Sequence, residues 1–215
     1  MKIVTYNIHR GADKKNNPTL NEIGYYLKNL DCDVICLQEV LYNQFKKIKS
    51  ILKIDGVFVA NVKQPGILYG ICIFSKYEIK DSAHLFLTSK KEQRGLLSIE
   101  INNNSESISI INTHLGLDKL ERYNQLNEIL DYCNRIGSKS IICGDFNEKN
   151  VNITNFIDMA VECDKYKIDT FESLKARIDY IFVDKNIYME KYDYHVDKTN
   201  LSDHYPVIVE IKEEK

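Results

Sequence analysis

The chain has no tryptophan, three prolines and nine glycines among its 215 residues. So few prolines and glycines, with no stretch rich in serine or in charges of one sign, exclude a flexible linker, and we predict one domain over residues 1–215. The 29 lysines and arginines nearly balance the 31 aspartates and glutamates, for a net charge of −2. This balance disfavours extended wrapping of a nucleic acid, although a local basic patch is compatible with it.

Long apolar runs are missing as well. The first residues reach Asn7, His9 and Arg10 before the apolar core of a secretory signal could form. No stretch approaches the roughly 18 apolar residues of a membrane-spanning helix, and no heptad pattern indicates a partner. We expect a soluble, cytoplasmic monomer. The six cysteines form no Cys-X-X-Cys pair and lie in apolar segments, which predicts reduced thiols in the core.

Short segments rich in isoleucine and valine recur along the chain. Each has the length of a strand, and several are apolar at nearly every residue, as expected where both faces of a sheet are covered. The predicted strands cover residues 2–8, 33–37, 57–62, 67–74, 96–101, 107–112, 140–143, 178–183 and 206–211. Turn-forming residues at 55–56, 65–66 and 102–104 separate some of these strands, and the last group predicts a hairpin.

Three segments carry apolar residues at helical spacing. Thr19 and Glu22 predict a capping box at the start of the first helix. The second helix is predicted over residues 42–52 and the third over residues 118–135. Strands with helices between them predict an α/β fold with two packed sheets flanked by helices.

Polar side chains lie at the ends of the predicted strands, where a rigid scaffold can direct them into one cleft. Taken singly, each has a structural alternative, such as a turn-forming asparagine, an exposed carboxylate or a structural histidine. Together they indicate a functional site. These residues are Asn7, Glu39, His114, Asp145, Asn147, Asp179, Asp203 and His204.

Two positions are the most difficult to explain structurally. In the segment GDFN, glycine permits a sharp turn, and Asp145 and Asn147 would project to the same side of an extended chain. Asp179 lies within an apolar strand, where a carboxylate needs a histidine, an arginine or a metal. This oxygen-rich set suits Mg²⁺ or Mn²⁺ better than Zn²⁺. The GxSxG and P-loop patterns are absent.

Six segments, in this order from residue 5 to residue 207, resemble the endonuclease/exonuclease/phosphatase superfamily of metal-dependent phosphoesterases: TYNIH, LQEV, NTHL, GDFN, RIDYIFV and SDHYPV. The resemblance covers essentially the whole chain. It implies a four-layered α/β sandwich, in which two mixed β-sheets pack face to face with helices outside. It also implies an active site at one edge of the sandwich.

The resemblance further implies a role for each matching residue. Glu39 corresponds to the principal Mg²⁺ (or Mn²⁺) ligand, helped by Asn7 and Asp203. The catalytic residues that it implies are His114, Asp145, Asn147, Asp179 and His204. Arg122 and Gln125 are similar to a family pattern and are expected to buttress the site.

Departures from the nuclease branches bear on the substrate. His9 stands where DNA-processing members carry aspartate, valine follows LQE, and no tryptophan is available for stacking. These departures disfavour a DNA-repair nuclease. The chain resembles small members of the superfamily that carry TYNIH and RIDYIFV, and this resemblance implies hydrolysis of a phosphodiester in a phospholipid head group or another small phosphoester. A DNA or RNA nuclease and a non-catalytic binding module are the alternatives. His9 and Arg94 are candidate substrate contacts, against a loop residue and a surface ion pair as alternatives.

Overall fold

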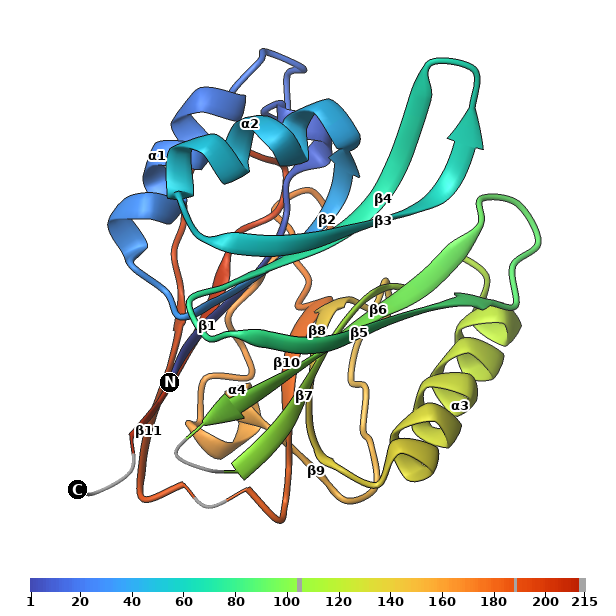
Figure 1. Ribbon diagram of the computed structural model, residues 1–215, viewed down its shortest axis with the longest axis vertical. Helices are drawn as coiled ribbons and strands as arrows, with labels where there is room; N and C mark the ends of the chain where they lie inside the picture. The colour runs from blue at the N-terminus through green and yellow to red at the C-terminus, as the bar shows by residue number, and fades with distance from the viewer. Residues whose placement is uncertain (104–105, 188, 213–215) are drawn as a thin grey trace.

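The computed structural model describes residues 1–103, 106–187 and 189–212. Two six-stranded sheets pack face to face (Figure 1). In spatial order the first sheet contains β11 (Lys191–Val196), β12 (Val207–Lys212), β1 (Lys2–Asn7), β2 (Val34–Leu41), β4 (Ile67–Ser75) and β3 (Asp55–Gln64). The second contains β5 (Ile79–Leu87), β6 (Arg94–Asn103), β7 (Glu106–His114), β8 (Lys139–Asp145), β10 (Asp179–Asp184) and β9 (Phe156–Asp158).

Helices cover the outer faces of both sheets, so the four-layered sandwich is confirmed (Figure 1). Helices α1 (Leu20–Leu30) and α2 (Tyr42–Leu52) pack on the first sheet, and α3 (Lys119–Ile136) packs on the second. Both sheets are mixed, because β1–β2 and β7–β8 are parallel pairs among antiparallel ones. The central core between the sheets consists mainly of isoleucine and valine, whose branched side chains pack well on pleated surfaces.

Three strands and two short helices, one of them the 3₁₀ helix η1 (His9–Gly11), escaped the sequence prediction. Strands β5, β9 and β11 each lie at the edge of a sheet, and α4 (Met159–Glu162) follows β9 directly. An edge strand is less completely covered than a central one, and β5 and β11 accordingly carry polar and exposed residues where the central strands are apolar. The pattern of continuous apolar segments therefore does not detect them.

The predicted turns have different outcomes. The turn at 65–66 joins β3 to β4, and Gly66 has a positive φ of 76° as such turns require. The prediction of a turn at 55–56 is wrong, because Asp55 and Gly56 are the first two residues of β3 and pair with β4. Strands β6 and β7 form the predicted hairpin, although residue 104 of its predicted turn lies outside the described residues.

The capping box predicted at α1 is also wrong. The helix begins at Leu20 as expected, but the hydroxyl of Thr19 donates to the carbonyl oxygen of Leu201 at 2.6 Å and does not cap the helix. A comparable bond occurs at α2, where the side-chain oxygen of Gln44 accepts from the backbone N–H of Leu41 at 3.1 Å. At α1, the tertiary hydrogen bond from Thr19 to Leu201 thus replaces the local capping bond.

All six cysteines are free thiols, as predicted. Five of them are buried in the core, and Cys163 is half-buried. Among the described helices, none has the length and apolar character needed to cross a membrane.

A buried polar bridge joins the two sheets beneath the strand ends. Asn112 on β7 accepts from Nε2 of Gln38 at 2.7 Å, and its own Nδ2 donates to the carbonyl oxygens of Leu37 and Cys72 at 2.9 Å each. Both side chains are fully buried. Because each bond spans the apolar interface between the sheets, the bridge sets how the sheets lie against one another.

We predict that Asn112→Ala lowers the free energy of unfolding by about 2–4 kcal/mol, because Gln38 and two carbonyl groups lose a buried partner. Urea denaturation followed by circular dichroism measures the change. Asn127→Ala, on an exposed position of α3, is the matched control and should stay within about 0.5 kcal/mol of wild type. Equal stability of the two variants would contradict the role given to the bridge.

Candidate active site

The polar residues predicted from strand ends converge at one edge of the sandwich, and both sheets contribute to the group. Strand pairing aligns His114, Asp145 and Asp179 in one row across β7, β8 and β10 of the second sheet. From the first sheet come Asn7, at the end of β1, and His204, three residues before β12. The site therefore exists only when the two sheets are correctly packed.

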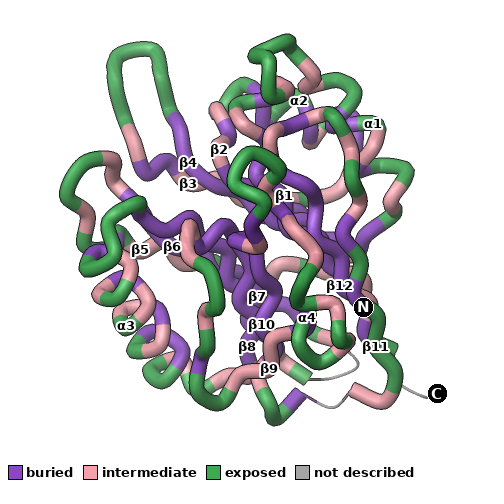
Figure 2. Tube along the Cα trace, turned by 180° about the vertical axis from the view of Figure 1, so that it is seen from behind, coloured by how far each residue is buried: buried purple, intermediate pink, exposed green. Residues whose placement is uncertain are grey.

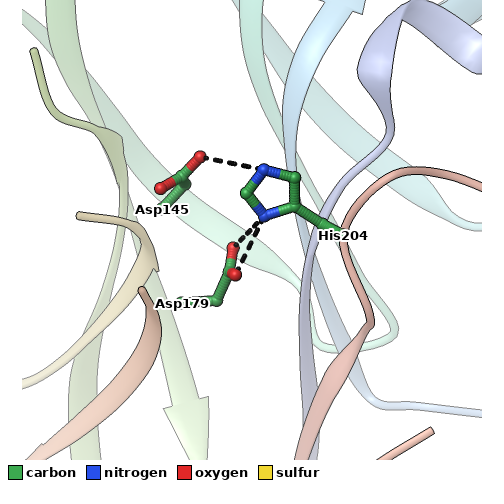
Figure 3. A group of neighbouring side chains, drawn as sticks. All are labelled: Asp145, Asp179 and His204. Carbon is green, nitrogen blue, oxygen red and sulfur yellow. Dashed lines mark hydrogen bonds and ion pairs between the residues drawn. The ribbon is translucent and has the colours of Figure 1, made fainter. Parts of the chain in front are cut away.

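His204 lies between two carboxylates of the opposite sheet (Figure 3). Its Nδ1 is 2.9 Å from Oδ2 of Asp179, and its Nε2 is 3.6 Å from Oδ2 of Asp145. The same Oδ2 of Asp179 accepts from the hydroxyl of Thr170 at 2.6 Å. Phe171 covers the imidazole, with 4.5 Å between ring centroids. The ring is held in orientation by Asp179 and by this aromatic contact.

The environment favours a positively charged His204. Burial acts to lower the pKa of this histidine, but the negative charges of Asp179 and Asp145 outweigh it and raise the pKa to about 10. Burial raises the pKa of Asp145 to about 6, while His204 and the amide of Asn7 act in the opposite direction. At neutral pH the site thus combines an imidazolium with an ionised carboxylate that can still accept a proton.

Asn7 connects Asp145 to Glu39. Its Nδ2 donates to Oδ2 of Asp145 at 3.0 Å and lies 3.4 Å from Oε1 of Glu39. Its side-chain oxygen accepts from the backbone N–H of His9 at 3.0 Å. In this arrangement Asn7 presents its NH₂ group to both carboxylates, and the oxygen that would bind a cation faces the backbone.

Glu39 was expected just beyond a strand, but β2 continues through it to Leu41. The pairing of β2 with β4 shifts register between Leu37 and Val40, which makes a β-bulge, and Glu39 has a left-handed φ of 57°. A bulge redirects a side chain without ending the strand. The bulge accounts for the approach of Glu39 to Asn7.

The GDFN segment has a different geometry from the one predicted. Gly144 makes no sharp turn: it lies within β8, and a Cβ there would be 2.0 Å from the carbonyl oxygen of Thr113 on β7. Asn147 has a left-handed φ of 50°, so the chain is not extended from Asp145 to Asn147. Oδ1 of Asp145 accepts from the N–H of Asn147 at 2.9 Å, and Nδ2 of Asn147 donates to the carbonyl oxygen of Leu115 at 2.9 Å.

His114 is held on its other side by an arginine. Nη1 of Arg94 is 3.0 Å from Nδ1 of His114 and 2.7 Å from a carboxylate oxygen of Glu92. An arginine only donates, so Nδ1 of His114 must accept and the ring carries its proton on Nε2. Burial, together with the positive charges of Arg94 and His204, lowers the pKa of His114 well below its usual value. That Nε2 is 3.5 Å from Oδ2 of Asp145.

The remaining predicted residues lie around this group. Nδ1 of His9 is 3.6 Å from Oδ1 of Asp203, and no hydrogen-bond partner of Nδ1 occurs among the described residues. Arg122 pairs with Glu148, at 2.5 Å between Nη2 and Oε2. Gln125 accepts from the N–H of Gly116 at 2.8 Å. Nη1 of Arg122 also donates to the carbonyl oxygen of Leu117 at 2.6 Å, so Arg122 and Gln125 both brace the loop after His114.

The side chains present suit a hard cation. Asp145, Asp179 and His204 offer ligand atoms within 4.8 Å of one another. Because both nitrogens of His204 face carboxylates and its pKa is raised, this ring is a poor ligand in the protonated state. Carboxylates are the better donors, and Asp145 and Asp179 flank His204 directly. Glu39 joins the same group through Asn7, and Asp203 precedes His204 in the chain.

Comparison with known proteins agrees with this fold. A model of the Endonuclease/Exonuclease/phosphatase family matches residues 4–204. The chain belongs to this family, whose members hydrolyse phosphoester bonds. A comparison with curated proteins finds no match.

Solved structures show the same fold at low sequence identity. An endonuclease/exonuclease/phosphatase family protein from Leptotrichia buccalis has 21% identity and a TM-score of 0.80, covering 99% of this chain and 100% of that one. Truncated TDP2 from Caenorhabditis elegans has 19% identity and a TM-score of 0.79, with coverages of 97% and 95%. A mannosyl-6-phosphatase from Bacteroides thetaiotaomicron has 18% identity and a TM-score of 0.76, with coverages of 99% and 100%.

Sequence reasoning missed Thr170, Phe171 and Glu92, and assigned no role to Gln38 and Asn112 within their motifs. Thr170 and Phe171 lie between α4 and β10, where no periodic pattern marks a residue as functional. Gln38 and Asn112 could have been found, because each is a polar residue within an apolar run and must be hydrogen-bonded if buried.

The raised pKa of His204 predicts a pH dependence of stability in metal-free protein. A histidine with a folded pKa near 10 and an unfolded pKa near 6.5 stabilises the fold fully below pH 6.5, and this contribution is lost as the pH rises toward 10. In EDTA, the free energy of unfolding should fall from pH 7 to 9.5 by up to about 1.4 kcal/mol per pH unit. Asp145 is already ionised there.

Urea denaturation of wild type and His204→Gln across this range measures the effect, and the glutamine variant should have the smaller slope. The slope that remains comes from buried thiols such as Cys36 and Cys72, whose pKa values burial raises. His195→Gln changes an exposed histidine on β11 and should follow wild type. Parallel profiles for wild type and His204→Gln would show that His204 is not held charged.

Proposed function

We propose that the protein is a Mg²⁺- or Mn²⁺-dependent phosphodiesterase that hydrolyses a small phosphoester. The observation that carries this proposal is the position of His204, a charged imidazole between Asp179 and Asp145 at the junction of the two sheets. A phosphodiester is an anion, and its hydrolysis builds further negative charge on oxygen. A fixed cation beside a carboxylate that can accept a proton meets both requirements of the reaction.

In the proposed reaction, water attacks phosphorus in line with the leaving oxygen. Oδ2 of Asp145 takes the proton of the water, because its pKa near 6 suits a base at neutral pH. His204 donates from Nε2 to a phosphate oxygen, and Asp179 stabilises the imidazolium through Nδ1. Asn147 holds the loop after Asp145 through its bond to Leu115.

The divalent ion would be held by Glu39 and Asp203, with Asn7 as a helper if its amide turns. When bound, the ion would neutralise phosphate oxygens and lower the barrier to attack by an anionic nucleophile. Carboxylate donors are the reason to expect Mg²⁺ or Mn²⁺. In this structure Asn7 instead ties Glu39 to Asp145.

Arg94 acts in this proposal as a positioning residue and not as a substrate contact. Its guanidinium is buried, and Nη1 donates to Nδ1 of His114 and forms an ion pair with Glu92. By occupying Nδ1 of His114 with a donor, Arg94 keeps the proton of that ring on Nε2, the nitrogen beside Asp145. His114 can then donate to a phosphate oxygen while remaining neutral.

The substrate class rests on composition and on one neighbour. The net charge of −2 and the absence of tryptophan disfavour a long nucleic-acid footprint. A structural neighbour is named as a mannosyl-6-phosphatase, an enzyme of a small phosphoester. The family name includes endonucleases and exonucleases, so nuclease activity is the alternative that the substrate panel must test.

We expect hydrolysis of bis(p-nitrophenyl) phosphate with Mg²⁺ or Mn²⁺, and loss of that hydrolysis in EDTA. Asp145→Asn and His204→Gln should each lower kcat/KM by roughly 10²–10⁴-fold, the contribution of a positioned acid or base. His195→Gln, an exposed histidine on β11, should retain wild-type activity.

A panel of phospholipids, sugar phosphates, single-stranded oligonucleotides and abasic duplex then assigns the substrate. Preference for oligonucleotides or duplex would replace the small-phosphoester proposal with a nuclease. Full activity in both Asp145→Asn and His204→Gln would reject the active site itself.

For Arg94 we predict that Arg94→Met lowers kcat by about 10- to 100-fold with little change in KM. Without the guanidinium on Nδ1, the proton of His114 is no longer held on Nε2, which slows the reaction step but leaves substrate binding unchanged. Nitrogen-15 spectra of the imidazole should show a single Nε2–H tautomer of His114 in wild type and a tautomer mixture in the variant. Glu92→Gln keeps Arg94 on His114 and should keep the wild-type spectrum. An unchanged tautomer in Arg94→Met would contradict the assignment.

A further inference from the structure

A cavity of about 710 Å³ lies between the tip region of the β3–β4 hairpin and the connection from β5 to β6. The tips of these two hairpins project on the same side of the molecule (Figure 1) and are exposed (Figure 2). Lys63 comes from the first hairpin and Lys91 from the second, while Arg10 and Tyr69 form part of the wall. The volume suits a substituted organic phosphate.

Positive charge in this cavity is in excess. Arg10, Lys63 and Lys91 line it, and in the part of the chain that the structure describes none of the three has a carboxylate within 4.0 Å. Glu92 is the one carboxylate of the lining, and it already pairs with Arg94 at 2.7 Å. Because the whole chain carries a net charge of −2, the excess is local to this cavity.

Arg10 is held over the cavity wall by a strained backbone. His9 and Arg10 both have left-handed φ values, 44° and 52°, which non-glycine residues adopt at an energetic cost. Gln44 supports this conformation by donating to the carbonyl oxygen of Arg10. The guanidinium then lies 5.4 Å from the centroid of the Tyr69 ring. Its planar, pre-oriented donors match the oxygens of a phosphate.

Two contacts link the cavity to the active site. Tyr69 pairs with Leu41, two residues beyond Glu39 on β2, and the nearby Glu39 carboxylate adds to burial in raising the pKa of Tyr69. On the opposite wall, Glu92 holds Arg94, which donates to His114. A substrate with its scissile phosphate at His114 could therefore extend into the cavity.

We propose that this cavity binds a second phosphate group of the substrate, so that the preferred substrate is a small phosphodiester carrying an additional phosphate. Arg10, Lys63 and Lys91 would contact that group, and the Tyr69 ring would pack against the part of the substrate between the two phosphates. This inference rests on the proposed function for the scissile phosphate, but the anion site itself can be tested without catalysis.

Titration calorimetry with inorganic pyrophosphate in EDTA tests the anion site. The variant is Lys63→Glu/Lys91→Glu, and the control with the same change of net charge is Lys28→Glu/Lys47→Glu, at exposed positions of α1 and α2. We expect wild type and control to bind alike and the cavity variant to bind at least about tenfold more weakly, because charge-assisted hydrogen bonds are lost. Equal affinity in all three proteins would overturn the proposal.

Turnover of a matched pair of esters tests whether the second phosphate belongs to the substrate. Water attacks the phosphorus of p-nitrophenyl thymidine 5′-phosphate, and the bond to p-nitrophenolate breaks; the second ester differs only by a 3′-phosphate. In wild type the 3′-phosphate should raise kcat/KM about tenfold. In the cavity variant, the ratio of the two kcat/KM values, with and without the 3′-phosphate, should approach one. A general loss of activity affects both esters equally and therefore does not change this ratio. A ratio near one in wild type would reject the substrate assignment.

Two further outcomes separate the possibilities. Pyrophosphate binding without hydrolysis of either ester would contradict the proposed function and leave the anion site supported. A third ester, with a nucleotide linked at the 3′ position, identifies the source of the second phosphate. If the linked nucleotide raises kcat/KM less than the free 3′-phosphate does, the result supports a small substrate. If it raises kcat/KM more, the result overturns the small-substrate proposal in favour of a nucleic-acid chain.

Discussion

The contact between His204 and Asp179 across the two sheets is the interaction on which the site depends. The histidine belongs to the first sheet and the carboxylate to the second, so their 2.9 Å separation requires both sheets to pack in one register. The bond between Asn7 and Asp145 makes the same demand from β1. Beneath them, the buried bridge from Gln38 to Asn112 holds the sheets together. The stability of the sandwich and the geometry of the site thus share the same polar contacts.

Charge distribution follows from that packing. The meeting of the sheets gathers carboxylates in a buried place, where burial raises the pKa of Asp145 and the carboxylates raise that of His204. His114 stays neutral nearby, because Arg94 donates to it and burial opposes a second imidazolium. Two histidines a short distance from one carboxylate therefore have different protonation states, which their neighbours decide.

The fold was predictable where burial is uniform. The central strands cover their faces completely, and their apolar segments identify them in the sequence, whereas β5, β9 and β11 lie at edges and carry mixed residues. Local signals failed where a tertiary contact competed with them: Thr19 bonds to Leu201 and does not cap its helix. The bulge that turns Glu39 toward Asn7 likewise depends on pairing between β2 and β4, which no local pattern reveals.

By itself the sequence determined the α/β class and its resemblance to the phosphoesterase superfamily, because apolar periodicity and six ordered motifs are local properties of the chain. It also determined which polar residues stand near strand ends. Only the tertiary structure decided which of them touch, that Arg94 lies on His114 instead of at the surface, and that unpaired cations gather at one cavity. Distances between side chains from different strands depend on sheet packing, and packing is set by contacts between residues far apart in the chain.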